Sequence, residues 1–426
     1  MRTRSFALFA VACVLFATEP NDATRRWWTH VTSLSGDDLK GRETGSEGYR
    51  TAAAYVVDQL SRAGVKAAGE NGWYQKVPLR VVRLRTDRSE IGLTGRPLRW
   101  LHEISLPARA NLPKSLDAPL VFEGTEGEPI DLKGAIVVRL GAPGGTGGGR
   151  GAGAAQSGML GTLTIDGSGG PEPPRWPVAY SAAMTLADGT PAGAGGPLAF
   201  RFNPSAADDL FAKSGHTYKE LLALAADNKP LPRFKLGNSL HAKLKVETAE
   251  LTCNNILGVL PGSDPELNKE YVVVSAHLDG YGTGEAWNGD SIYNGAFDDA
   301  AYVATLIDMA EKLRASGKRL KRSLLFAVVT AEEKGLLGSR YFIAHPTVPK
   351  ERMVANVNLD QLRPIFPLKT LTTLALEDST LGDTVRQVAA PMGIKIQPDP
   401  EPGRNLLRRS DHWNFMQIGV PAVGFI

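Results

Sequence analysis

The stretch Tyr271-Val-Val-Val-Ser-Ala276, followed at once by His277-Leu-Asp279, decides how this chain is expected to fold. Its apolar and β-branched residues do not alternate with polar ones, which is typical of a strand buried on both faces of a parallel sheet. Ligands of such sheets bind beyond the carboxyl ends of the strands. We therefore expect His277 and Asp279 to lie at the edge of the sheet where a ligand binds.

Two later stretches repeat this arrangement. Residues 324–330 are apolar and lead to Glu332-Glu333, and residues 354–359 lead to Asp360. A further acidic pair, Asp298-Asp299, lies between the first and second stretches. Each group taken alone could be the polar end of a core strand, but the repetition favours one shared site built from several strand ends.

The residue types in these groups predict a metal site. Residues two apart on a strand point the same way, so Asp279 can hold the His277 imidazole in one tautomer while the other ring nitrogen binds a metal. Glu332 and Glu333 are adjacent and diverge, so one can bind metal while the other acts as a general base. Imidazole combined with carboxylate suits Zn²⁺ better than Ca²⁺ or Mg²⁺.

Charge balance favours two zinc ions over one. Three carboxylate ligands and a bridging hydroxide together balance the charge of two Zn²⁺ ions, about 4 Å apart, that hold a hydrolytic water. A metal also lowers the pKa of a bound water towards about 7, so the general base has only to move a proton. The predicted reaction is metal-assisted hydrolysis of an amide or peptide bond.

Composition is ordinary for a soluble globular protein and gives no sign of nucleic-acid binding. The chain has 426 residues, of which 42% are hydrophobic and 22% charged, enough for a large domain with an insertion. Its formal net charge is only +3. No stripe of Lys and Arg interleaved with aromatic residues is present, so we expect no nucleic-acid partner.

The amino terminus resembles a secretory signal over residues 1–20. Arg2 and Arg4 precede an apolar run over residues 6–17, which is too short to span a bilayer. We expect an exported protein, periplasmic or secreted, without stable membrane association once the signal is removed. An uncleaved anchor and lipid attachment at Cys13 are the alternatives. Without Cys13, only Cys253 remains, so no internal disulfide is expected.

The predicted fold is α/β, with a mostly parallel central sheet flanked by helices and a small β-rich module inserted into it. Residues 21–110 and 236–426 form the two parts of the main domain, and residues 111–235 form the insertion, where short strand-like pieces alternate with Gly- and Pro-rich turns. Helices are expected over residues 48–64 and 299–316, from their apolar faces and the glycines that follow them.

Taken together, the motifs resemble those of the clan MH zinc peptidases, which include leucyl aminopeptidases, aminopeptidase Y, glutamate carboxypeptidase II and glutaminyl cyclase. The inserted module is similar to a protease-associated (PA) domain, with Asp131-Leu-Lys-Gly134 before its strand. The resemblance covers nearly the whole chain after the signal. Its motifs are Leu39-Lys-Gly-Arg-Glu-Thr-Gly45, Asn255-Ile-Leu-Gly258, Gly262-Ser-Asp-Pro265, Ala276-His-Leu-Asp279, Gly295-Ala-Phe-Asp-Asp299, Thr330-Ala-Glu-Glu333, Asn358-Leu-Asp360 and Ser410-Asp-His412.

This resemblance implies a role for each site residue. Asp298 would bridge two zinc ions, and Asp299 would be a structural neighbour. Glu332 would be the general base, and Asp279 would orient His277. The zinc ligands would be His277, Asp298, Glu333 and Asp360.

The sequence departs from the family pattern at two places. Ala301-Tyr302 stands where the family has Ser-Gly, which puts a bulky ring at the start of a helix. The family takes a fifth ligand from a Tyr-His motif beyond the position where this sequence stops. We therefore expect the second zinc to be held more weakly, with His412 as the only nearby substitute. A truncated form, a degraded relative and an active enzyme with weaker metal retention are the three explanations.

The resemblance implies a zinc-dependent exopeptidase, best interpreted as an aminopeptidase that acts on peptides or proteins. The alternatives are an impaired relative that serves as a binding protein, a carboxypeptidase and a glutaminyl cyclase. The sequence leaves open the terminus attacked, the preferred side chain, the oligomeric state and the role of the insertion. Arg408 and Arg409 either bind a substrate carboxylate or form a solvated basic pair. His345 is expected to be structural.

Overall fold

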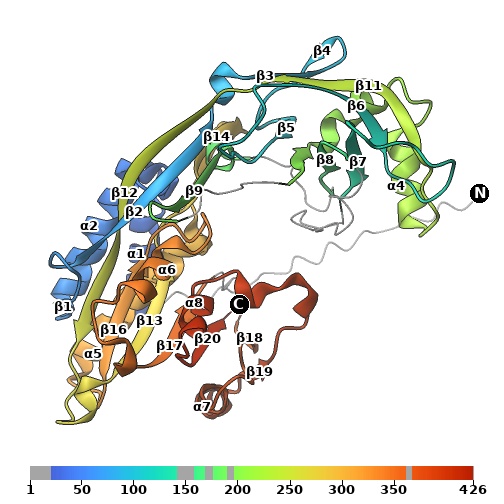
Figure 1. Cartoon of the computed structure of the whole chain (residues 1–426). Coiled ribbons are helices and arrows are strands. Elements are labelled where there is room, and N and C mark those ends of the chain that lie inside the picture. Colours follow the sequence, from blue (N-terminus) through green and yellow to red (C-terminus); the bar gives the residue numbers. More distant parts are fainter. Residues whose placement is uncertain (1–20, 142–157, 168–175, 190–195, 361–366, 426) are drawn as a thin grey trace, which may run out of the picture.

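The computed structural model describes residues 21–141, 158–167, 176–189, 196–360 and 367–425 (Figure 1). The signal expected at residues 1–20 lies outside this part of the chain and remains a prediction. Among the described residues, no helix combines the length and apolar composition that crossing a bilayer requires.

Within the described residues, ten strands form the main sheet, and its central strands are parallel. β13 pairs in parallel with β16 and with β17, and β17 pairs in parallel with β20, whereas β12 and β2 run antiparallel to their neighbours. The α/β class is confirmed, and the parallel part of this mixed sheet is the part that carries the site. In spatial order the strands are β19 (Lys395–Gln397), β18 (Thr370–Leu374), β20 (Ala422–Phe425), β17 (Met353–Leu359), β13 (Tyr271–His277), β16 (Ser323–Val329), β12 (Val246–Leu260), β2 (Tyr74–Leu84) and β9 (Ala182–Leu186), with β1 (Lys66–Ala67) paired to β12.

The central strands are buried on both faces, as their uninterrupted apolar sequences predict. Val274 and Phe326 face one core and Val273 and Leu325 face the other, because successive residues of a strand point to opposite sides. The first core is covered by α1 (Asp22–Leu34), α2 (Glu47–Arg62) and α5 (Ala301–Ser316), and the second by α6 (Leu337–Ala344) and α8 (His412–Gln417). Figure 1 shows α1 and α2 on one side of the sheet and α6 and α8 on the other.

The two predicted helices form close to their predicted positions. The Ser46 side chain accepts a hydrogen bond from the Tyr49 backbone and caps the start of α2. Gly317 ends α5 in the left-handed conformation, with φ of 62°, which glycine adopts without strain. The helix predicted over 299–316 begins as α5 only at Ala301, because Asp298 and Asp299 have non-helical backbone angles.

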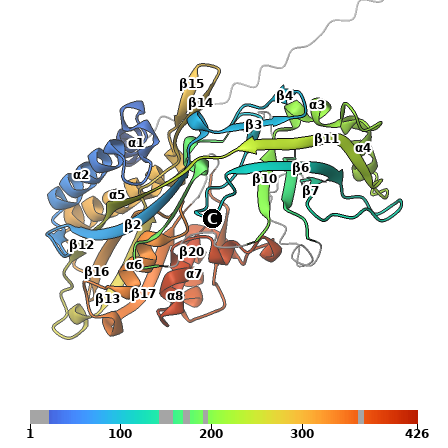
Figure 2. The same cartoon turned by 45° about the horizontal axis from the view of Figure 1, so that its top comes forward.

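A second sheet extends beyond the predicted insertion of residues 111–235 at both ends. β2 and β12 run from the main sheet towards it, and β11 and β3 continue them into it (Figure 2). β9 returns from within the insertion to pair with β2 of the main sheet. The PA identity of the module remains a prediction. Its strands, in spatial order, are β4 (Arg96–Pro97), β3 (Glu90–Leu93), β11 (Phe234–Lys243), β6 (Ser115–Phe122), β7 (Ile136–Leu140), β8 (Gly161–Ile165), β10 (Leu198–Phe202) and β5 (Ile104–Ser105).

The remaining elements are short. A hairpin of β14 and β15 follows β13 and contacts the loop that contains Arg42. These elements are β14 (Gly282–Trp287), β15 (Asp290–Tyr293), α3 (Ala207–Phe211), α4 (Tyr218–Ala226) and α7 (Leu381–Ala389).

Candidate metal centre

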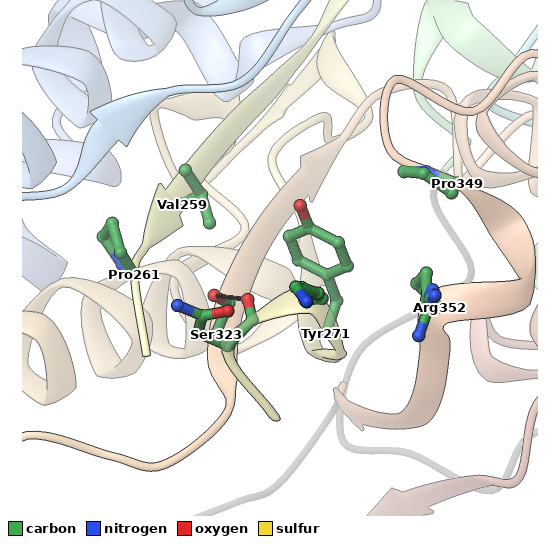
Figure 3. Close-up of a pocket in the computed structure, with 8 residues that line it drawn as sticks. Val259, Pro261, Tyr271, Ser323, Pro349 and Arg352 are labelled. Atoms are coloured by element: carbon green, nitrogen blue, oxygen red, sulfur yellow. Dashed lines mark hydrogen bonds between the residues drawn. The ribbon is translucent and has the colours of Figure 1, made fainter. Parts of the chain in front are cut away.

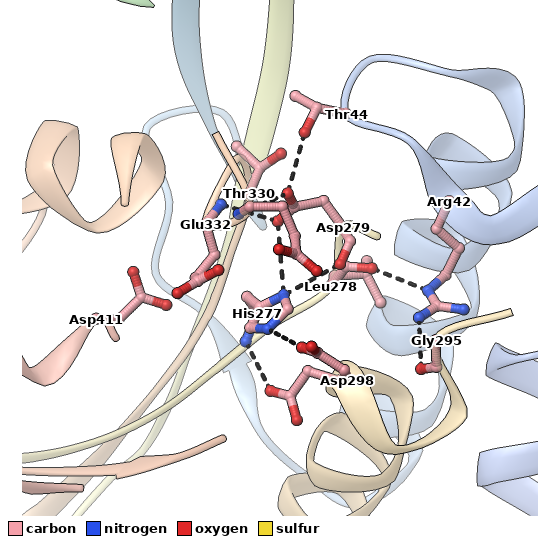
Figure 4. Close-up of polar contacts among 12 residues, drawn as sticks. Arg42, Thr44, His277, Leu278, Asp279, Gly295, Asp298, Thr330, Glu332 and Asp411 are labelled. Carbon is pink, nitrogen blue, oxygen red and sulfur yellow. Dashed lines mark hydrogen bonds and ion pairs between the residues drawn. The ribbon is translucent and has the colours of Figure 1, made fainter. Parts of the chain in front are cut away.

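Three of the four predicted metal ligands meet at the carboxyl ends of the parallel strands. The Nε2 atom of His277 lies 3.0 Å from Oδ1 of Asp298 and 3.9 Å from Oδ1 of Asp360. One ligand atom from each of these residues lies within 4.8 Å of the other two. His277 ends β13, Asp298 precedes α5 and Asp360 follows β17, so three distant segments supply one site. Figure 4 shows His277 and Asp298 facing each other.

The adjacent carboxylates of Asp298 and Asp299 point in different directions. Asp298 faces the His277 ring, whereas Asp299 accepts a hydrogen bond from the His277 backbone N–H at 3.1 Å. Their peptide bond is cis. Asp299 is buried and holds the end of β13, while a third of the Asp298 side chain is exposed on the site.

The Asp279 carboxylate contacts both the His277 ring and the segment that contains Glu332 and Glu333. The Nδ1 atom of His277 lies 3.0 Å from the backbone carbonyl of Asp279, and 3.8 Å from its carboxylate. That carboxylate also accepts hydrogen bonds from the backbone N–H groups of Glu332 and Glu333, at 3.1 and 3.4 Å, and from the Thr44 hydroxyl at 3.1 Å. Two backbone N–H groups that follow β16 donate to this carboxylate, so Asp279 positions the two glutamates, and its backbone carbonyl is the nearer of its two groups to the His277 ring.

Glu332 and Glu333 occupy different surroundings, as adjacent residues at a strand end should. Ala331 adopts a left-handed φ of 53° and turns the chain sharply after β16. The Glu332 side chain is buried and lies beside Asp411 (Figure 4). Glu333 lies outside the three-residue group, and the nearby Tyr281 phenol partly opposes the rise in its pKa that burial causes. The structure thus separates the two carboxylates and leaves their chemical roles as predictions.

The centre has more buried negative charge than its own residues neutralise. One oxygen atom each of Asp299, Glu333, Asp360 and Asp411 is buried and makes no hydrogen bond within the described part of the chain. Burial alone would lower the pKa of His277, but the carboxylates of Glu332, Asp298, Asp299 and Asp360 raise it well above its usual value. Unpaired buried carboxylates are costly, and a bound cation would offset that cost. The imidazole and carboxylate donors fit zinc.

This charge excess predicts that the metal-free protein becomes more stable as the pH falls from about 8.5 to about 6.8. Burial raises the pKa of Glu333 to about 8 and that of Asp411 to about 7. In that window the folded state binds protons that the unfolded chain has released, so the free energy of unfolding rises as the pH falls. A gain of several degrees in Tm is expected by differential scanning calorimetry.

Zinc-loaded protein is the control, because a metal holds its carboxylate ligands ionised and should abolish the gain. The window ends above pH ~6.5, where histidines begin to titrate. Burial lowers the pKa of His412 to about 4, so its protonation favours unfolding at lower pH. A constant or falling Tm in the metal-free protein would contradict the electrostatic description of the site.

Several other predicted residues lie outside the three-residue group. His412 is fully buried against Gly424, and neither ring nitrogen has a hydrogen-bond partner of ordinary geometry among the residues that the structure describes. Tyr302 is buried in the core covered by α1, α2 and α5. The Arg408 guanidinium stacks 4.9 Å from the centre of the Trp413 ring, and His345 stacks on Tyr341. The last contact fits the structural role expected for His345.

Sequence reasoning assigned no role to two residues that complete the surroundings of the site. Asp411 is fully buried, accepts a hydrogen bond from the Ser339 hydroxyl and lies in the field of Asp360. The Ser410-Asp-His412 motif was the available signal, although it did not indicate this contact. Arg42 is also fully buried beside the site, and its signal was the motif of residues 39–45.

Two hollows in the described part of the chain lie away from this centre. One of about 480 Å³ opens where β13, β16 and β17 begin, at the opposite end of the strands from His277, and is lined by Val259, Tyr271, Ser323 and Arg352 among others (Figure 3). Its polar Ser323 hydroxyl donates a hydrogen bond to the Asn268 carbonyl. We therefore assign the chemistry to the carboxyl ends of the strands.

Comparison with known proteins agrees with this assignment. The model of peptidase family M28 matches residues 255–426, a segment that holds every predicted metal ligand. The resemblance inferred from the motifs is thereby confirmed, and the M28 segment contains the parallel strands of the main sheet.

A curated relative and two solved structures extend the comparison. Leupeptin-inactivating enzyme 1 of Streptomyces exfoliatus is 23% identical over 270 residues, which cover 58% of this chain and 56% of that protein. This chain thus spans about half the length of that relative. The aminopeptidase from Aneurinibacillus sp. strain AM-1 has a TM-score of 0.59 at 18% identity, covering 95% of this chain and 85% of its own. The zinc aminopeptidase BSAP from Bacillus subtilis has a TM-score of 0.60 at 17% identity, covering 96% and 85%. These likenesses establish the M28 peptidase fold.

Proposed function

We propose that this chain is a zinc-dependent exopeptidase, an aminopeptidase that removes amino-terminal residues from peptides or proteins. One observation carries the proposal. Ligand atoms of His277, Asp298 and Asp360 lie within 4.8 Å of one another, and all three residues belong to the segment that matches the M28 family model. The buried oxygen of Glu333 that makes no hydrogen bond within the described residues adds one further ligand atom without a cation. The aminopeptidase names of two proteins that share its fold support the direction of attack.

In this proposal His277, Asp298, Glu333 and Asp360 would hold two zinc ions. Zinc bound there would supply Lewis acidity and make a water acidic near neutral pH. The residues of the chain do the rest. Glu332 accepts a proton from the attacking water and returns it to the departing amine.

The surroundings of Glu332 suit a base that must carry a proton between two steps. Burial raises its pKa well above the usual value, and the carboxylates of Asp360, Asp411 and Glu333 add to the rise while His277 opposes it. A base with a raised pKa holds the proton long enough to hand it on. The Asp279 carboxylate accepts a hydrogen bond from the backbone N–H of Glu332 and so fixes the position of that residue. The Glu332 carboxylate therefore does not need to be ordered during the reaction.

The test is hydrolysis of leucine p-nitroanilide by the zinc-loaded full chain. We expect activity that is lost on dialysis against a chelator and restored by added Zn²⁺. N-acetyl-leucine p-nitroanilide is the matched control, because an aminopeptidase requires the free amine. Cleavage of the acetylated substrate at an equal rate would contradict amino-terminal specificity. No hydrolysis by protein of verified zinc content would instead favour the binding-protein alternative.

A further inference from the structure

The fully buried side chain of Arg42 connects three segments around the candidate metal centre. Arg42 ends a short helical turn over Asp37–Arg42, at a left-handed φ of 49°, and none of it is exposed. Its Nε atom donates to the carbonyl of Leu278 at 2.9 Å, between His277 and Asp279. Its guanidinium therefore contacts the main chain of the residue that separates two site residues.

The other nitrogen atoms of Arg42 hold the loop that leads to Asp298. Nη1 donates to the carbonyls of Leu34 and Asn294, and Nη2 donates to that of Gly295 at 3.0 Å. Figure 4 shows the guanidinium between Leu278 and Gly295, on the side of the centre away from Asp411. One planar group thus fixes the segment of His277 relative to the segment of Asp298.

Close packing around Gly295 shows that this arrangement has little freedom. A Cβ atom at Gly295 would lie 2.5 Å from the Asp298 carbonyl and 2.9 Å from Nη2 of Arg42, and Gly295 has a left-handed φ of 61°. Only glycine lets the two groups approach this closely without strain. The position of Asp298 therefore depends on the contact between Gly295 and Arg42.

The partners of Arg42 are unusual for a buried cation. All of its hydrogen bonds within the described residues go to carbonyl groups, and it forms no ion pair at salt-bridge distance there. Burial lowers its pKa to about 10, opposed first by the field of Asp279, so it remains charged at neutral pH. A planar fork can reach several carbonyls in fixed directions, which the single ammonium of lysine cannot do.

We propose that Arg42 is a positioning residue of the metal centre, which sets the separation of Asp298 from His277 and so determines zinc affinity. The inference rests on the zinc site proposed above. The positive charge of Arg42 and its positioning contacts have opposite effects on zinc affinity. The positive charge of Arg42 repels a bound cation, so its removal alone would strengthen binding. Loss of the positioning contacts would weaken binding, because ligands must be held close to the productive geometry.

Two substitutions separate these effects. Arg42→Lys keeps the positive charge but loses the planar guanidinium group, and Arg42→Met loses both. We expect both variants to bind Zn²⁺ at least ten-fold more weakly than the parent, by calorimetric titration of the metal-free full chain. We also expect the visible spectrum of the Co²⁺-substituted protein to change, because it reports the ligand geometry directly. Thermal unfolding of each metal-free variant is measured in parallel.

Val56→Ala is the matched control for stability. Val56 is fully buried in the same core, on α2, away from the metal ligands, so its truncation should lower Tm without changing zinc affinity or the Co²⁺ spectrum. Gly295→Ala disturbs the same contact from the other side and should reproduce the effect of Arg42→Lys. It also replaces Arg42→Lys if that variant does not fold.

Each outcome of these measurements either supports or overturns the positioning role of Arg42. Parental affinity and spectrum in Arg42→Lys would overturn the proposal, and tighter zinc binding by Arg42→Met in that case would assign Arg42 a role through charge alone. A loss of affinity by Val56→Ala equal to that of Arg42→Lys would also overturn it, since stability would then explain both. If the parent itself binds neither Zn²⁺ nor Co²⁺, the proposed function fails before this inference is reached.

Discussion

Glu332→Gln is expected to lower kcat for leucine p-nitroanilide by about 10²–10⁴-fold, the usual contribution of a general base, while zinc content stays at the parental level. Glutamine fills the same space but cannot accept the proton of the attacking water. KM should change little, because the substitution removes proton transfer and no binding contact. Steady-state kinetics and metal analysis of the same preparation provide the measurement.

Glu333→Gln is the matched control for that experiment. The two glutamates are adjacent and share the Asp279 carboxylate through their backbone N–H groups, so each substitution disturbs the loop to a similar degree. We expect Glu333→Gln to lose zinc, because Glu333 is a predicted ligand. Loss of zinc by Glu332→Gln together with retention by Glu333→Gln would exchange the two roles. Parental kcat in Glu332→Gln would remove it as the base.

Asp298→Ala is expected to bind less zinc than the parent and to lose about 10³-fold or more in kcat/KM, which corresponds to several kcal/mol of metal-derived stabilisation. Asp298 lies closest to the His277 ring among the grouped carboxylates, and the resemblance assigns it the bridging position. Removal of the Asp298 carboxylate should therefore weaken the binding of both zinc ions. Metal content per chain and calorimetric titration with Zn²⁺ measure the change.

Asp299→Asn controls for the choice between neighbouring carboxylates. Asp299 accepts a hydrogen bond from the His277 backbone N–H, and the asparagine oxygen can accept the same bond. We expect this variant to keep its zinc and most of its activity. If Asp299→Asn loses zinc as Asp298→Ala does, the structural role of Asp299 is wrong. If Asp298→Ala keeps two zinc ions, the bridging role of Asp298 is wrong.

The central strands of the main sheet could be predicted because a strand buried on both faces has an uninterrupted run of apolar residues. The run Tyr271–His277 contains no alternating polar residue, since Val273 and Val274 each face a hydrophobic core. The limits of the insertion were less clear. β3 lies before residue 111 and β11 continues past residue 235 to Lys243, yet both join the second sheet, because β2 and β12 carry the chain continuously from one sheet towards the other.

The sequence by itself determined which residues stand at the carboxyl ends of the parallel strands, because uninterrupted apolar runs fix both the strands and the polar residues that follow them. Only the tertiary structure decided which atoms of those residues face one another. The Asp279 carboxylate accepts a hydrogen bond from the backbone of Glu332. Arg42 donates a hydrogen bond to the carbonyl of Leu278, which lies 236 positions away in the sequence. Such contacts depend on where distant segments pack, and local periodicity carries no information about that.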